Sequence, residues 1–125
     1  MAVKKLFIAN RGEIALRIVH AAKALGIETV IGVSEIDRDT QAALEADVMV
    51  VLGPAAAASS YLDPKLIVHA ARETGCDALH PGYGFLSEKP ILPTLCEEQG
   101  IAFVGPQADI IDLLGDKLQD RKSVV

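Results

Sequence analysis

The stretch Leu6-Phe7-Ile8-Ala9-Asn10-Arg11-Gly12-Glu13 decides the fold, because the spacing of its apolar residues changes within it. Residues 6–9 form an apolar run of strand length, and the three residues after them have the chemistry of a turn. From Glu13 onward the apolar residues recur at helical spacing until Gly26, a typical residue at the end of a helix. The stretch therefore predicts a strand, a tight turn and a helix over residues 13–25.

The same alternation continues along the chain. Asp63 and Pro64 mark one helix start clearly, since Asp can cap free backbone N–H groups and Pro at the first helical position loses no hydrogen bond. The other expected elements are strands at 29–33, 48–52, 78–80 and 102–104, and helices at 41–46, 64–75, 91–99, 108–114 and from 117 onward. Alternating strands and helices predict the α/β class: a Rossmann-like parallel sheet of about five strands with helices on both faces.

Composition favours one globular domain without nucleic acid or a membrane as partner. The chain has 125 residues, 50% of them hydrophobic, and a net charge of −5, with its basic residues scattered. No apolar run approaches the ~18 residues of a membrane span, and the run after the basic opening is too short for a secretory signal. We therefore expect a cytoplasmic location. Cys76 and Cys96 are expected to be free thiols.

Ligands of open parallel sheets lie off the carboxyl ends of the strands, so the loops there are the candidate sites. The loop after the first strand would need the pattern G-x-G-x-x-G to bind a dinucleotide, and only Gly12 and Ala15 match it. Glu13 also places negative charge at the start of the helix, where a pyrophosphate would lie. The sequence thus argues against a dinucleotide site in this loop.

Two further loops carry residues suited to chemistry. His80 ends a strand and is followed by a glycine-rich segment; it is either a base or ligand, or a hydrogen-bonded structural residue. Lys117 lies in the first turn of the last expected helix, where a cation opposes the helix macrodipole. It is either an exposed surface charge or a group that binds an anion such as phosphate.

Five segments together resemble biotin carboxylases in their order and spacing. They are Ile8-Ala9-Asn10-Arg11-Gly12-Glu13-Ile14-Ala15, Ser60-Tyr61-Leu62, His80-Pro81-Gly82-Tyr83-Gly84-Phe85-Leu86-Ser87-Glu88, Phe103-Val104-Gly105-Pro106 and Gly115-Asp116-Lys117. The resemblance covers essentially the whole chain. The resemblance implies a family of ATP-dependent ligases, which carboxylate biotin on a carrier protein with bicarbonate. Members of this family are components of acetyl-CoA, propionyl-CoA and pyruvate carboxylases, including those of fatty acid biosynthesis.

The resemblance also implies what this chain contributes. Residues 1–125 match the domain that precedes the ATP-grasp and C-terminal domains, and end at the start of the connection to the ATP-grasp domain. Lys117 matches a lysine that reaches the ATP phosphates, and Gly82, Tyr83 and Gly84 would line the inner edge of the cleft. No catalytic residue or metal ligand is assigned to the chain. ATP, Mg and biotin would be bound mainly by the later domains, with a biotin carrier protein and a second copy of the enzyme as partners.

The isolated chain is accordingly expected to be inactive and to bind none of these cofactors tightly. The sequence departs from the family pattern just after Glu88, and His20 stands where some relatives carry an arginine used in dimer contact. We therefore expect at most weak self-association. The alternative is a stand-alone nucleotide-binding or carboxylase-assembly module without catalysis.

Overall fold

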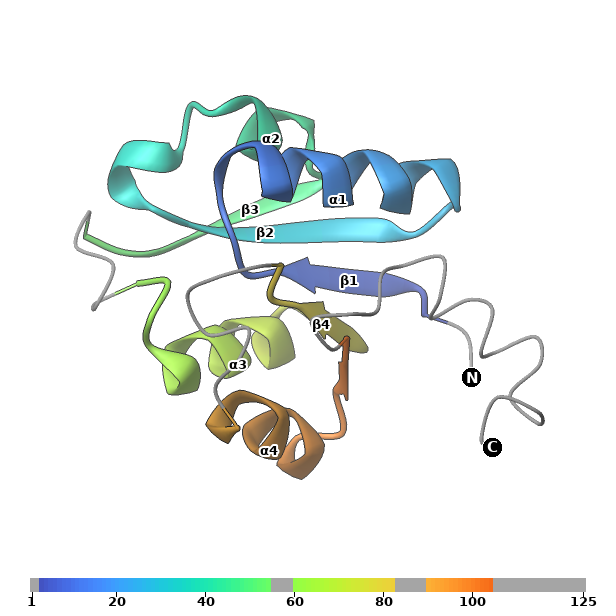
Figure 1. Ribbon diagram of the computed structural model, residues 1–125, viewed down its shortest axis with the longest axis vertical. Coiled ribbons are helices and arrows are strands. Elements are labelled where there is room, and N and C mark those ends of the chain that lie inside the picture. The colour runs from blue at the N-terminus through green and yellow to red at the C-terminus, as the bar shows by residue number, and fades with distance from the viewer. Residues whose placement is uncertain (1–2, 55–59, 83–89, 105–125) are drawn as a thin grey trace.

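The computed structural model describes residues 3–54, 60–82 and 90–104 (Figure 1). Its elements, in chain order, are β1 (Lys5–Ile8), α1 (Gly12–Ala24), β2 (Glu28–Ser34), the 3₁₀ turn η1 (Glu35–Asp37), α2 (Gln41–Glu45), β3 (Val48–Gly53), α3 (Pro64–Glu73), β4 (Ala78–His80), α4 (Ile91–Glu98) and β5 (Ala102–Phe103). The predicted alternation is confirmed over these ranges, with element ends shifted by one or two residues. The helices expected at 108–114 and from 117 onward lie outside the described residues.

The five strands form one parallel sheet in the order β3-β2-β1-β4-β5. The chain builds one half of the sheet from β1 to β3 and then returns to the other side of β1 to build β4 and β5. The order therefore reverses between β1 and β4. Such a switch point opens a crevice at the carboxyl ends of the two central strands, where open α/β sheets bind their ligands.

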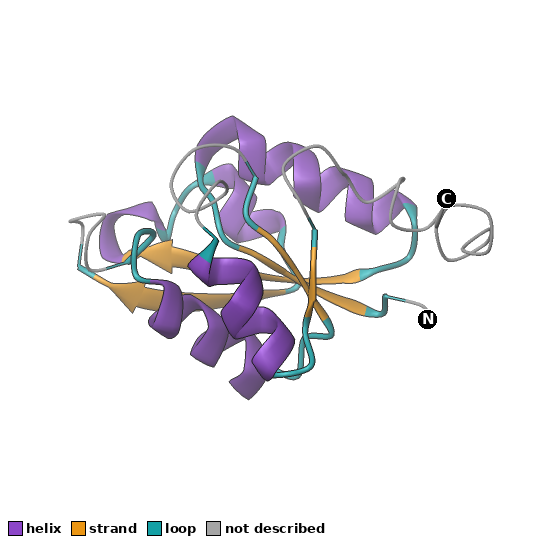
Figure 2. Ribbon diagram, turned by 60° about the horizontal axis from the view of Figure 1, so that its bottom comes forward, coloured by secondary structure: helices purple, strands orange, loops and turns teal. Residues whose placement is uncertain are grey.

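Helices cover both faces of the sheet, as predicted (Figures 1 and 2). Alternate residues of β1 point to opposite faces, so Leu6 and Ile8 pack with α1 and α2, while Phe7 packs with α3 and α4. All three of these side chains are fully buried. Among the described helices, none is long and apolar enough to cross a membrane.

Local signals at the helix ends act as the sequence indicates. The Asp63 side chain accepts a hydrogen bond from the Leu66 N–H at 3.1 Å, and Pro64 is the first residue of α3. Gly26, just after α1, has a φ of +74°. Only glycine adopts this left-handed conformation without strain, which explains why α1 ends there.

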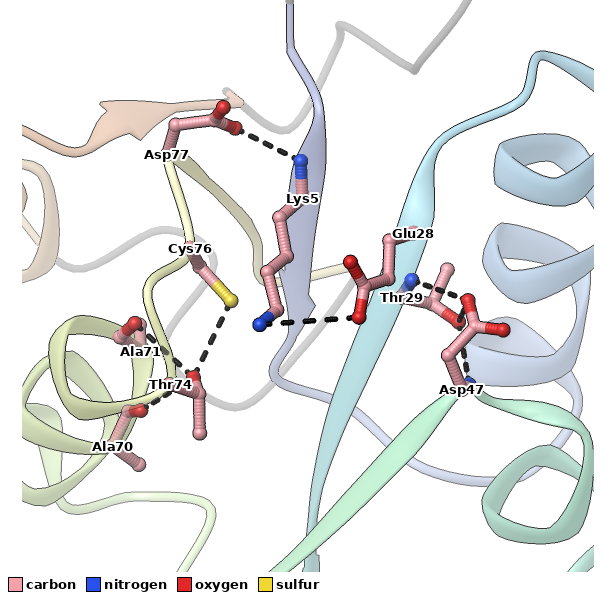
Figure 3. A network of polar contacts seen from close by, with 9 residues as sticks. All are labelled: Lys5, Glu28, Thr29, Asp47, Ala70, Ala71, Thr74, Cys76 and Asp77. Carbon is pink, nitrogen blue, oxygen red and sulfur yellow. Dashed lines mark hydrogen bonds and ion pairs between the residues drawn. The ribbon is translucent and has the colours of Figure 1, made fainter.

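A set of polar contacts holds the amino-terminal ends of the strands together (Figure 3). The Asp77 carboxylate accepts hydrogen bonds from the backbone N–H groups of Lys4 at 3.0 Å and Lys5 at 3.2 Å, and so joins β1 to the start of β4. On the other side, Asp47 accepts from the Thr29 N–H at 2.8 Å and joins the starts of β2 and β3. The hydrogen bonds at the amino-terminal ends of the strands therefore have a structural role, because they join neighbouring strands.

Replacing Asp77 with Ala is expected to lower the free energy of unfolding by about 1–2 kcal/mol, because two backbone donors lose a charged acceptor. Urea denaturation of the chain measures this value. Asp77→Asn, which keeps one acceptor oxygen, should lose less. An unchanged midpoint for Asp77→Ala would mean that water replaces the carboxylate without cost.

Both cysteines are buried and free, as predicted. Burial raises the pKa of the Cys96 thiol to about 11, and burial also raises the pKa of Cys76. A thiol reacts as its thiolate, so neither residue is suited to act as a nucleophile near neutral pH.

Candidate functional site

The carboxyl ends of β1 and β4 are joined by a buried asparagine. Asn10 is 1% exposed, and its side-chain N–H donates to the Pro81 carbonyl oxygen at 2.7 Å. Its side-chain oxygen accepts from the N–H of Arg11 at 2.8 Å. One side chain thus fixes both the loop that leads into α1 and the loop that follows β4, at the point where the strand order reverses.

Gly82 lies directly against this asparagine. Its φ is +69°, and a Cβ atom placed on it would lie 2.6 Å from Asn10 Nδ2 and 2.9 Å from Ile14 Cγ2. Both distances are shorter than side-chain carbon atoms tolerate, so the position requires glycine for its conformation and for its space. The close approach brings the backbone after β4 onto the start of α1.

His80 orients the same loop from the strand. The side chain is buried, and its Nδ1 accepts a hydrogen bond from the Gly82 N–H at 3.0 Å. An amide N–H can only donate, so the ring carries its proton on Nε2 in this arrangement. Of the two readings left open for His80, this geometry favours the structural one.

A second polar cluster lies beside this edge and centres on Asp37, which is 4% exposed. The Arg11 guanidinium approaches its carboxylate with both Nε, at 3.1 Å, and an Nη, at 3.3 Å. The hydroxyls of Ser34 and Tyr61 donate to the same carboxylate at 3.0 and 2.7 Å. The cluster ties the end of β2 to the loop before α3 and to the start of α1.

Burial raises the pKa of Tyr61 to about 12, and the hydrogen bond to Asp37 adds to the shift. A pKa raised on folding contributes stability that is complete below about pH 10 and is lost as the pH rises towards 12. Ultraviolet titration should show one of the two tyrosines ionising near pH 12. Tyr61→Phe should abolish that late step. Its persistence in the variant would show that the other tyrosine causes it.

Sequence reasoning placed some of these residues and missed others. Gly82 follows β4 at the switch point of the sheet, and its expected place at the inner edge of a cleft stays a prediction. Tyr83, Gly84 and Lys117 lie outside the described residues. The sequence did not predict that Asp37 is buried, because residues 34–38 have the composition of a polar loop. The only hint was the Ser60-Tyr61-Leu62 segment, which contains Tyr61, the hydrogen-bond partner of Asp37 in the structure.

Among the described residues, no group of three or more His, Cys, Asp or Glu side chains lies close enough to hold a metal ion. The described part of the edge offers backbone groups, a half-exposed guanidinium and a glycine packed against Asn10. Such an edge can position a ligand or a neighbouring domain.

Proteins similar to this chain in sequence and fold include biotin carboxylases. The family model of the biotin carboxylase N-terminal domain matches residues 2–111. Biotin carboxylase of Haemophilus influenzae is 51% identical over 122 residues, which are 98% of this chain and 27% of that protein. The alpha subunit of mitochondrial methylcrotonoyl-CoA carboxylase of Arabidopsis thaliana is 48% identical over 120 residues, which are 96% of this chain and 16% of that protein.

Solved structures agree with the sequence comparison. The crystal structure of a biotin carboxylase complex with beta-gamma-ATP from Campylobacter jejuni matches with a TM-score of 0.80 at 39% identity, over 83% of this chain and 23% of that one. The chain spans about a quarter of the length of these bacterial proteins. Sequence and fold together show that the chain belongs to the family of biotin carboxylase N-terminal domains.

Proposed function

We propose that the chain works as the N-terminal domain of a biotin-dependent carboxylase, in which biotin on a carrier protein is carboxylated by bicarbonate with hydrolysis of ATP. The observation that carries the proposal is the contact of Gly82 with Asn10 at the switch point, within a segment that resembles the family. This contact supports the proposal because the Asn10 hydrogen bonds hold the two loops together at the edge where the cleft of the parent enzyme would lie.

In this proposal Gly82, Tyr83 and Gly84 line the inner edge of the cleft, and Lys117 binds the phosphates of ATP. In the same proposal, residues 1–125 belong to the N-terminal domain that precedes an ATP-grasp domain in the parent enzyme. By the resemblance to biotin carboxylases, Mg, ATP and biotin are bound mainly by the ATP-grasp and C-terminal domains of the parent enzyme. When bound there, ATP would supply the phosphoryl group that activates bicarbonate.

The proposed partners are those two domains, a biotin carrier protein and a second copy of the parent enzyme. His20 Nε2 on α1 lies within hydrogen-bond distance of Glu45 Oε1 of α2, at 2.6 Å, within the chain. This pairing is consistent with weak self-association of the chain alone. Relatives serve different pathways, as the methylcrotonoyl-CoA carboxylase illustrates, so fatty acid biosynthesis is one proposal for the final role.

A chimeric enzyme tests the proposal. The matching N-terminal segment of the Haemophilus influenzae enzyme would be replaced by this chain, which is 51% identical to it. We expect ATP hydrolysis that depends on bicarbonate. The chain alone, and the Haemophilus influenzae enzyme without its N-terminal segment, should show none, because each lacks part of the cleft. ATP hydrolysis by the chain alone would contradict the proposal that ATP and Mg are bound mainly by the other domains.

A further inference from the structure

An open groove of about 200 Å³ lies between α3 and α4. These two helices cover the face of the sheet opposite to α1 (Figure 1). The residues that line it are Lys65, Val68, His69, Arg72, Leu95 and Gln99. Lys65, His69, Arg72 and Gln99 of this groove belong neither to the core nor to the proposed cleft, whereas Val68 and Leu95 border the core.

Two cationic side chains and a histidine line the groove, although the chain is acidic overall. Lys65, His69 and Arg72 are exposed and follow one another on α3 at spacings of four and three residues, so they form one stripe about 10 Å long. Within the described ranges, none of the three takes part in an ion pair with another described residue. No acidic side chain lines the groove, although the whole chain carries a net charge of −5.

Between the cations and α4 the groove has an apolar floor. Val68 is 4% exposed, and Leu95 is partly buried against the core beneath it. A small anion such as phosphate has no apolar surface to bury against Val68 and Leu95, whereas a peptide can place an apolar side chain on them. Nucleic acid needs a longer basic stripe and would be repelled by the net negative charge of the chain.

We propose that this groove binds an acidic peptide segment of a partner protein. Two or more carboxylates of the segment pair with Lys65, His69 and Arg72, and an apolar side chain packs on Val68 and Leu95. A helix with Glu at i, i+4 and i+7 repeats the spacing of Lys65, His69 and Arg72, so its carboxylates meet these three side chains along the same stripe. Arg72 can accept a carboxylate with two parallel hydrogen bonds. This proposal does not depend on carboxylase activity.

The test uses a fluorescently labelled helical peptide with Glu at i, i+4 and i+7 and Leu at i+3, titrated with the 125-residue chain and followed by anisotropy. We expect saturable binding that weakens as salt is added, since exposed charges are screened. The double variant Lys65→Gln, Arg72→Gln should bind about tenfold more weakly. The matched double variant Arg17→Gln, Lys23→Gln removes two exposed charges from α1 and should bind within about twofold of the unchanged chain.

Amide chemical shifts of the unchanged chain locate the peptide independently of any variant. The proposal requires peptide-induced shifts on α3 and α4 in preference to α1. It is overturned by the absence of saturable binding, by shifts elsewhere, or by equal losses in the two double variants. It is also overturned if inorganic phosphate or duplex DNA displaces the peptide at matched charge, because the groove would then be a general anion surface.

Discussion

Replacing Gly82 with Ala is expected to lower the free energy of unfolding by about 2–5 kcal/mol. A left-handed φ costs a residue with a side chain about 1–2 kcal/mol, and the overpacked Cβ adds about 1–3 kcal/mol. The added carbon would meet Asn10 Nδ2 at 2.6 Å and Ile14 Cγ2 at 2.9 Å, and both neighbours are held within the structure. Urea denaturation measures the loss.

Gly26 provides a matched control. Its φ of +74° is close to that of Gly82, but nothing lies within 4 Å of a Cβ placed on it. Gly26→Ala should therefore lose only the conformational part, about 1–2 kcal/mol. Equal losses at the two positions would show that the contact with Asn10 contributes nothing to the requirement for glycine.

Replacing Lys117 with Gln in the chimeric enzyme is expected to weaken ATP binding about tenfold to hundredfold. The expected loss is that of one charge-assisted hydrogen bond, roughly 1.5–3 kcal/mol. A lysine in the first turn of a helix opposes the macrodipole, and a bound phosphate offsets that cost. The melting temperature should hardly change, because the proposed role of Lys117 is to bind ATP and not to stabilise the fold.

Calorimetric titration with ATP measures this effect in the chimeric enzyme. Lys23→Gln, which removes an exposed charge from α1, serves as the control and should leave the ATP affinity unchanged. In the isolated chain the Lys117 substitution should have no effect on ATP binding, since the remainder of the nucleotide site is missing. Equal affinity in the unchanged and Lys117→Gln chimeras would make this lysine a surface charge only.

The fold was largely predictable because its signals are local. The Asp63 cap and the left-handed Gly26 act within a few residues of the helix ends that they determine. Short apolar runs and helical spacings of apolar residues alternate along the sequence and can be read from it directly. This alternation predicts a parallel sheet with helices on both faces.

The site was predictable only in part, because its key contacts join distant residues. Asn10 and Pro81 are 71 positions apart, and no local pattern marks Asn10 as buried. The burial of Asp37 likewise depends on Arg11 and Tyr61, which come from other loops. The sequence and the resemblance single out Gly82 as a candidate site residue. Only the structure shows why this position requires glycine, namely that its backbone lies against Asn10.

The most direct measurement of the central claim is the fixation of radiolabelled bicarbonate into biotin by the chimeric enzyme, beside the intact Haemophilus influenzae enzyme. The two proteins share 51% identity over the exchanged segment. If the chain is a working biotin carboxylase N-terminal domain, the chimera should fix label within about tenfold of the intact enzyme, since a factor of ten corresponds to only about 1.4 kcal/mol in the barrier. A folded chimera that binds ATP but fixes no label would contradict the claim.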